Sequence, residues 1–235
     1  MFELSKYTLY SSPFCPFSRK VIFFLDERGV DYQLTDVKYW LRDKDFVKLN
    51  QASETPVLKN MQTQEVICDS FLICNYIDEL EIKEDELGYF NFLGNGLPEK
   101  YEIQRLHMWF DKKFYNEVSK HFIEEIFLNY VKGNKSTDME KINIVLQNLD
   151  KHILYIEYLL SKRKWLACES FTVADMAAAT QLSILDYMGY INWNKYRKLK
   201  DWYIIIKSKQ GFKKILYDTK IIGFKPSACY TELDF

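Results

Sequence analysis

The feature that most constrains the fold is a cysteine–proline pair between a strand-like pattern and a helical pattern. Tyr7–Tyr10 forms a short β pattern, and residues 16–28 carry apolar side chains at helical spacing before Gly29. Pro16 suits the first helical position because it has no N–H group and its φ angle is already helical. Cys15 is therefore the expected N-cap, where unpaired N–H groups and the helix dipole favour a thiolate.

Ser18 stands where dithiol oxidoreductases carry a second cysteine. The motif Cys15-Pro16-Phe17-Ser18 cannot close an internal disulfide, so redox turnover at Cys15 requires an external thiol. The alternative is that Cys15 is simply a small buried apolar residue, as free cysteines often are.

Composition narrows the class of protein. The chain has 235 residues, 48% of them apolar and 28% charged, which predicts a globular protein of one or two domains. A net charge of −1 gives no field that attracts nucleic acid. The five scattered cysteines predict reduced thiols in the cytoplasm, and they lack metal-ligand spacing. The sequence has no apolar run of the ~20 residues that a membrane-spanning helix needs, so we expect no membrane span.

The pattern of the chain changes once. Residues 1–82 alternate strand and helix patterns in the order β-α-β-α-β-β-α, which predicts an α/β domain. Residues 83–98 begin with a charged run and continue with glycines and a proline, so they are the predicted linker. Residues 99–235 show only helical periodicity and end in an aperiodic tail, which predicts an all-helical domain with an extended tail.

One helix start in the second half is marked clearly. Thr172 and Asp175 form a predicted capping box, in which each side chain accepts a hydrogen bond from the backbone of the other residue. We interpret this box as structural. Long helices are expected over residues 99–130 and 139–160, and shorter helices over residues 195–208 and 212–217.

The ordered set of motifs resembles the glutathione S-transferase superfamily, with a cysteine of the omega- and beta-like type. The resemblance implies a thioredoxin-like N-terminal domain, an all-helical C-terminal domain, glutathione as cosubstrate and a homodimer. The matching stretches are Cys15-Pro16-Phe17-Ser18, Thr55-Pro56-Val57-Leu58, Asp69-Ser70 and Phe171-Thr172-Val173-Ala174-Asp175.

The resemblance also implies roles for single residues. Pro56 would follow a cis peptide bond, which turns the backbone of Thr55 toward the cysteinyl group of glutathione. Ser70, at a helix N-terminus, would bind the γ-glutamyl carboxylate, because an anion is favoured there. Asp69 replaces the usual glutamate and is one methylene shorter. Cys15 would lie opposite the glutathione sulfur and form a mixed disulfide.

A narrower resemblance concerns the helical half. It is similar to the GST-like cell-division proteins of alphaproteobacteria that bind FtsZ filaments, in residues 109–118, 184–189 and 230–235. That resemblance implies a dimeric, non-catalytic binding platform whose C-terminal tail contacts the polymer. The tail is short, aperiodic and acidic, which suits a docking segment; the alternative is that it packs on its own domain. Its candidate contact residues are Tyr230, Leu233, Asp234 and Phe235.

Two functions therefore remain open. The first is glutathione binding with thiol transfer through Cys15, which would make the protein a glutathione transferase or thiol transferase. The second is a non-catalytic regulator of cell division that binds FtsZ polymer. Fold alone does not separate them.

Overall fold

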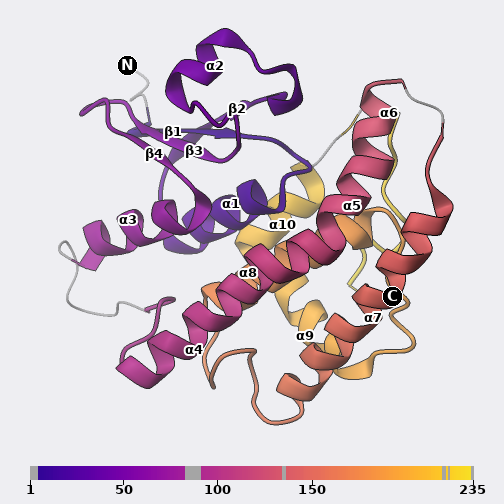
Figure 1. The fold of residues 1–235 in the computed structure, drawn as a ribbon. Helices are drawn as coiled ribbons and strands as arrows, with labels where there is room; N and C mark the ends of the chain where they lie inside the picture. Colours follow the sequence, from indigo (N-terminus) through magenta and orange to yellow (C-terminus); the bar gives the residue numbers. More distant parts are fainter. Residues whose placement is uncertain (1–4, 83–90, 134–135, 219–220, 222, 234–235) are drawn as a thin grey trace. The chain divides into compact units, whose positions relative to one another are not determined.

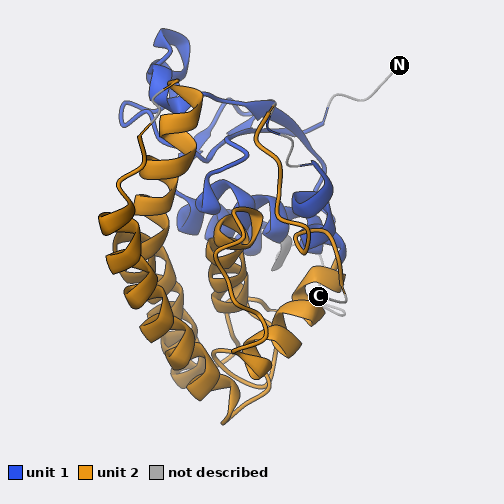
Figure 2. Cartoon of the chain, turned by 90° about the vertical axis from the view of Figure 1, so that its right-hand side faces the viewer, with its two compact units in different colours: residues 1–90, 210–221 blue, residues 91–209, 222–235 orange. Residues whose placement is uncertain are grey.

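The computed structural model describes residues 5–82, 91–133, 136–218, 221 and 223–233. Their contacts divide the chain into two units. Unit 1 comprises residues 1–90 and 210–221, and unit 2 comprises residues 91–209 and 222–235 (Figure 2). The predicted α/β fold in the first part and all-helical fold in the second part are confirmed.

Unit 1 is built on a four-stranded mixed sheet with the strand order β2-β1-β3-β4. β1 pairs with β2 in parallel and with β3 in antiparallel orientation, and β3 and β4 form the predicted antiparallel hairpin. The strands are β1 (Tyr7–Ser11), β2 (Tyr32–Asp36), β3 (Val57–Asn60) and β4 (Val66–Cys68).

Helices cover both faces of this sheet. Figure 1 shows α1 and α3 on one face and the short α2 on the other. Leu9 and Leu58, which are paired across β1 and β3, are fully buried. On the side of α2, Val37, Phe46 and Val57 form a small apolar cluster. The helices are α1 (Pro16–Arg28), the 3-10 turn η1 (Tyr39–Leu41), α2 (Lys44–Leu49) and α3 (Ser70–Ile82).

The last helix, α10 (Gln210–Asp218), belongs to unit 1. Gly211 permits its close packing on α1, because a Cβ atom at this position would lie 2.9 Å from the carbonyl oxygen of Phe23. Its N–H group donates to Glu27 Oε1 at 3.2 Å, and the rings of Phe23 and Phe212 lie 5.2 Å apart. The structure thus differs from the predicted division, in which residues 99–235 form one domain. Nothing local in the helical pattern of residues 210–218 signals the partner on which they pack.

Unit 2 is all helical, and its first described residues, 91–96, belong to the predicted linker. Phe92 joins the unit through its carbonyl oxygen, which accepts from Val173 N–H at 3.0 Å. Residues 83–90 of that linker lie outside the described residues. The helices are α4 (Leu97–Met108), η2 (Trp109–Ser119), α5 (Lys120–Phe122), η3 (Ile123–Leu128), α6 (Asn129–Val131), α7 (Met139–Leu160), α8 (Val173–Tyr187) and α9 (Arg197–Ser208).

The stretch from α4 to α6 is the predicted long helix, with an unexpected winding. η2 and η3 are π-helical, with i→i+5 hydrogen bonds. Five buried side chains recur here every four residues, a spacing that would drift by about 40° per step around an α-helix of 3.6 residues per turn. A π-helix holds more residues per turn than an α-helix, so the π-helical winding of η2 and η3 keeps these buried side chains in one stripe on one face. The stripe comprises Leu106, Phe110, Phe114, Val118 and Phe122.

α8 is the centre of unit 2, since every residue from Val173 to Tyr187 is buried. The predicted capping box between Thr172 and Asp175 is present. The Asp175 carboxylate does more than cap its own helix. Its Oδ1 atom also accepts from Leu166 N–H at 2.9 Å and from Trp202 Nε1 at 3.1 Å.

None of the described helices combines the length and the apolar character that crossing a bilayer requires.

Candidate functional site

Cys15 is the N-cap of α1, as the sequence predicts. Its backbone is extended, with φ −96° and ψ 114°, and Pro16 occupies the first turn. The Cys15 N–H group donates to Ser12 O at 3.0 Å, which closes the turn between β1 and α1. Cys15 is buried, with only 7% of its surface exposed.

The thiol of Cys15 makes a polar contact with the backbone before Pro56. Its Sγ atom donates to the carbonyl oxygen of Thr55 at 3.2 Å. Only a protonated thiol makes this bond, because a carbonyl oxygen can only accept.

The Thr55–Pro56 peptide bond is cis, as the resemblance implies. Thr55 is 7% exposed, and its hydroxyl is buried without a hydrogen-bond partner among the described residues. The Ser12 hydroxyl is also buried without a hydrogen-bond partner among the described residues. The carbonyl of Thr55, rather than its hydroxyl, is therefore the group directed at the sulfur.

Ser18 stands at the position of the absent second thiol, and its role there is structural. It is fully buried, and its Oγ atom accepts from Ser12 N–H at 3.3 Å. All five cysteines are free. Burial, together with the nearby Asp69 charge, raises the pKa of Cys68, and burial raises the pKa of Cys168 to about 11.

Asp69 and Ser70 come to the same end of the sheet. β3 and β4 pair Val57 with Cys68, so the next step along each strand brings Pro56 opposite Asp69. Ser70 is buried at the first position of α3, and Asp69 is exposed. The register thus brings the candidate glutathione residues Thr55, Pro56, Asp69 and Ser70 to one edge of unit 1.

Asp69 is the residue that departs most from the expected role. Its backbone is left-handed, with φ 77°, and its Oδ1 atom accepts from Phe71 N–H at 2.8 Å and from Leu72 N–H at 3.2 Å. The short side chain therefore caps its own helix. Two of the N–H groups at this helix start are already satisfied, which leaves fewer donors for a bound carboxylate. The residues fit the sulfur end of glutathione better than its γ-glutamyl end.

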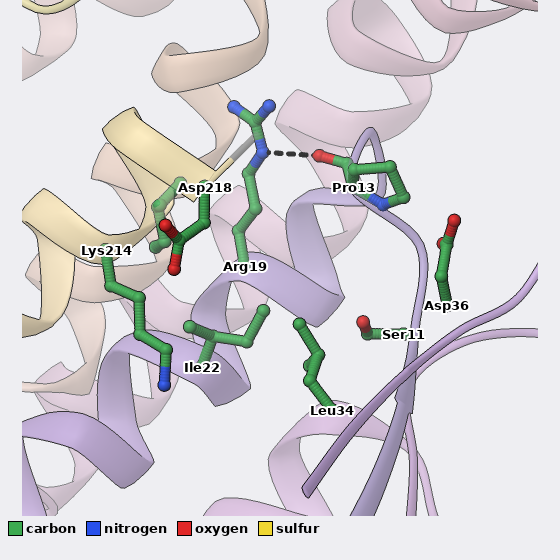
Figure 3. A pocket seen from close by; sticks show the side chains of 9 residues that line it. Ser11, Pro13, Arg19, Ile22, Leu34, Asp36, Lys214 and Asp218 are labelled. Carbon is green, nitrogen blue, oxygen red and sulfur yellow. Dashed lines mark hydrogen bonds between the residues drawn. The ribbon is translucent and has the colours of Figure 1, made fainter. Parts of the chain in front are cut away.

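A cavity of about 180 Å³ lies elsewhere in unit 1, and sequence reasoning missed it. Figure 3 shows Arg19 at this cavity, with its Nε atom donating to Pro13 O at 2.9 Å. Burial raises the pKa of Asp36, another lining residue. Cys15 does not line the cavity, which is therefore separate from the thiol. The lining residues are Ser11, Pro13, Arg19, Ile22, Leu34, Asp36, Lys214, Ile215 and Asp218.

The C-terminal tail packs in part on unit 2. Tyr230 is fully buried, and its ring meets the ring of Tyr187 edge-on with centroids 4.9 Å apart. Leu233 is 41% exposed. Asp234 and Phe235 lie outside the described residues. The four tail residues named from the sequence thus include one buried anchor and one exposed side chain.

The described part of the chain contains no group of three or more histidine, cysteine, aspartate or glutamate residues that could hold a metal ion.

Comparison with known proteins defines the class. The model for the N-terminal domain of glutathione S-transferases matches residues 14–80, and the model for their C-terminal domain matches residues 117–204. The chain belongs to the glutathione S-transferase family, which confirms the resemblance drawn from its motifs.

The chain is also similar to particular members of this family. FtsZ-localized protein A of Caulobacter vibrioides is 35% identical over 230 residues, which are 97% of this chain and 98% of that protein. The solved structure titled FzlA from C. crescentus has a TM-score of 0.92 at 34% identity, covering 98% and 100% of the two chains. A glutathione S-transferase from Rhodospirillum rubrum F11 has a TM-score of 0.90 at 32% identity, covering 97% and 100%.

Proposed function

We propose that this glutathione S-transferase-like protein is a cytoplasmic cell-division protein that binds FtsZ polymer. The observation that carries the proposal is its similarity to FtsZ-localized protein A along nearly the whole chain, in sequence and in fold. Because the match covers 98% of that relative, it includes both domains rather than one shared module.

We propose that the C-terminal tail makes the contact with the polymer. Tyr230 is buried, so it serves as the anchor of the tail and does not touch the partner directly. Leu233 is exposed, and Asp234 and Phe235 follow it in the sequence. An exposed apolar side chain next to an acidic and an aromatic residue has the character of a peptide-like docking segment.

Co-sedimentation with FtsZ polymer tests this function. The full chain should pellet with polymer in a saturable manner, and a variant that lacks residues 233–235 should pellet less. This truncation spares Tyr230, so it leaves the buried anchor in place. The matched control is Ile144→Ala, which shortens another exposed apolar side chain of unit 2. Absence of pelleting above the level without FtsZ would refute the proposal.

The second candidate function is glutathione-dependent thiol transfer. The contact between Cys15 Sγ and Thr55 O supports it, because it places the sulfur beside the backbone that the family uses for the cysteinyl group. The Cys15 thiolate attacks the glutathione sulfur of a disulfide between glutathione and a substrate thiol, the S–S bond breaks, and the substrate thiolate leaves and takes up the proton that Cys15 released. The thiolate of a second glutathione then attacks the glutathione sulfur of the Cys15 mixed disulfide, which releases glutathione disulfide and restores Cys15.

Intact-mass measurement after incubation with glutathione disulfide tests this step. The wild type should gain one glutathionyl group, and Cys15→Ala should gain none. Cys68→Ala is the control, because its raised pKa keeps that thiol protonated at neutral pH. Calorimetric titration with glutathione supplies the affinity. Equal labelling of wild type and Cys15→Ala, without saturable binding, would exclude this chemistry.

We also propose that the protein is a homodimer, as members of this family commonly are. Large exposed apolar side chains support the proposal in each unit. Leu72 of α3 is 56% exposed in unit 1, and Tyr101 and Met108 of α4 are 65% and 49% exposed in unit 2. Light scattering should give twice the chain mass of 28.2 kDa, and a value of one chain mass across the concentration range would contradict it.

A further inference from the structure

Lys207, near the end of α9, is a fully buried lysine. A buried ammonium is unfavourable unless its N–H groups meet acceptors. The Nζ atom of Lys207 meets oxygen atoms on both α8 and the C-terminal tail. They are the carboxylate Oδ2 of Asp186 at 3.2 Å, the carbonyl oxygen of Cys229 at 2.7 Å and the carbonyl oxygen of Glu232 at 3.2 Å. Both carbonyl oxygens belong to the backbone of the C-terminal tail.

The partner of Lys207 on α8 is equally well fixed. Asp186 is 1% exposed, and its Oδ1 atom accepts from Trp193 Nε1 at 3.0 Å. The backbone carbonyl of Asp186 accepts from Ser227 Oγ at 2.6 Å, so Asp186 itself also holds the tail. The ion pair and the tail therefore meet at one site, at the C-terminal end of α8.

Further contacts hold the tail to Tyr187, the next residue of α8. Its backbone carbonyl accepts from Ser227 N–H at 2.8 Å, and its hydroxyl donates to Phe224 O at 2.6 Å. The ring of Tyr230 packs edge-on against the Tyr187 ring. Glu232 N–H donates to Cys229 O at 3.3 Å, so Lys207 binds both ends of one closed turn. The ammonium contact with Glu232 immediately precedes the exposed Leu233.

We propose that Lys207 is a positioning residue for the C-terminal tail, and that its ammonium fixes the turn 229–232 so that Leu233 is presented in one orientation. The proposal rests on the proposed contact between the tail and FtsZ polymer. A pre-ordered base reduces the conformational entropy that is lost when the tail binds a partner. Lys207 therefore raises the affinity of the tail for its partner without contacting the partner directly.

The test compares four full-length proteins: wild type, Lys207→Met, the double variant Lys207→Met with Asp186→Asn, and Lys198→Met. Methionine keeps an unbranched apolar side chain and removes the ammonium. The double variant also removes the carboxylate charge that Lys207→Met would leave buried and unpaired. Lys198→Met is the matched control, because Lys198 is exposed on the same helix.

Two measurements are made on each protein. Hydrogen exchange with mass spectrometry follows the peptides of residues 223–235 and, as a fold control, those of α8. Co-sedimentation with FtsZ polymer gives the affinity. Freeing one backbone residue of the tail base costs on the order of 1.4 kcal/mol, so both Lys207 variants should bind about tenfold more weakly. Their tail should exchange faster, with α8 unchanged, and Lys198→Met should match wild type.

The outcomes separate the two proposals. Faster tail exchange without loss of affinity would overturn the positioning role, and so would unchanged tail exchange in the double variant. If wild type does not bind FtsZ polymer, the proposed function fails. In that case exchange alone decides whether Lys207 holds the tail. Faster exchange in α8 of Lys207→Met would mark a general loss of folding. In that case the double variant decides whether Lys207 positions the tail.

Discussion

Cys15 and Thr55 are forty residues apart in the sequence, yet Cys15 Sγ donates to Thr55 O at 3.2 Å. The N-cap of α1 supplies the sulfur, and the residue before cis-Pro56 supplies the oxygen. Nucleophilic attack by the Cys15 sulfur requires loss of the proton that it donates to Thr55 O. The contact is therefore both the strongest support for thiol chemistry here and the bond that this chemistry must first break.

Thr55→Val should leave the site intact and stabilise unit 1. The Thr55 hydroxyl is buried without a partner among the described residues, and valine has nearly the same shape. Removing an unsatisfied buried hydroxyl should raise the free energy of unfolding by about 1 kcal/mol. Denaturant unfolding measures the gain, and the extent of glutathionylation at Cys15 should not change. A loss of stability would show that the hydroxyl is hydrogen-bonded in solution.

Asp69→Ala should destabilise the start of α3 more than Asp69→Asn. Asparagine retains a capping oxygen and tolerates the left-handed φ of 77°, whereas alanine offers neither advantage. We expect a cost of about 2 kcal/mol for alanine, the sum of the lost cap and the backbone penalty. Thermal unfolding of the two variants measures the difference. Equal stabilities would contradict the capping role.

Gly211→Ala should weaken the docking of α10 on α1. The added Cβ atom would lie 2.9 Å from a backbone oxygen of Phe23, which cannot move as a side-chain tip can. Overpacking of this kind costs about 1–3 kcal/mol. The control is Lys213→Ala, an exposed position on the same helix. Hydrogen exchange in residues 210–218 should rise in Gly211→Ala alone, and equal exchange in both variants would refute the steric argument.

Asp175 should make stability fall as pH rises from about 4 to 6. Burial raises its pKa to about 6, although hydrogen bonds from Leu166, Thr172 and Trp202 oppose the shift. A carboxyl whose pKa is raised by folding contributes stability that is complete below its ordinary value near 4, and this contribution is lost as pH passes 6. Asp175→Asn removes the titration.

Chemical unfolding of wild type and Asp175→Asn at several pH values checks this sign. The free energy of wild type relative to the variant should decrease between pH 4 and pH 6. An increase over that interval would show that the carboxylate is stabilised, rather than penalised, by its buried surroundings.

Much of the fold could be predicted because its signals are local. The helix 16–28 is bounded by Pro16 and by Gly29, which adopts the left-handed φ of 70° expected at a helix end. The capping box at Thr172 is also a local pattern, and it forms as predicted. The bounds of α7 agree with the predicted residues 139–160 for the same reason.

The features that sequence reasoning missed depend on contacts between distant segments. The periodicity of residues 210–218 predicts a helix but not its packing on α1, which Gly211 decides through a backbone atom of Phe23. The apolar stripe from Leu106 to Phe122 predicts a buried face, whereas its repeat of four residues points to the wider winding only in retrospect.

In the candidate site, too, the features with local signals could be predicted and those that depend on three-dimensional contacts could not. Cys15 and Pro56 could be located from short motifs, and the structure brings Cys15 to the residue before Pro56. The capping role of Asp69 could not be predicted, because the sequence pair Asp69-Ser70 does not show which oxygen accepts from which N–H group. The buried ion pair of Asp186 and Lys207 has no local signal either, since one partner lies on α8 and the other on α9.

The return of α10 to unit 1 bears on how the chain is synthesised. Phe23 is fully buried and packs against Phe212, so part of the interior of unit 1 is supplied by a segment that leaves the ribosome after most of unit 2. Residues 91–209 are made in between, which takes roughly 6–24 s at about 5–20 residues per second. During that interval the nascent α1 lacks its covering helix. A fragment that ends at residue 90 would keep that apolar surface uncovered permanently.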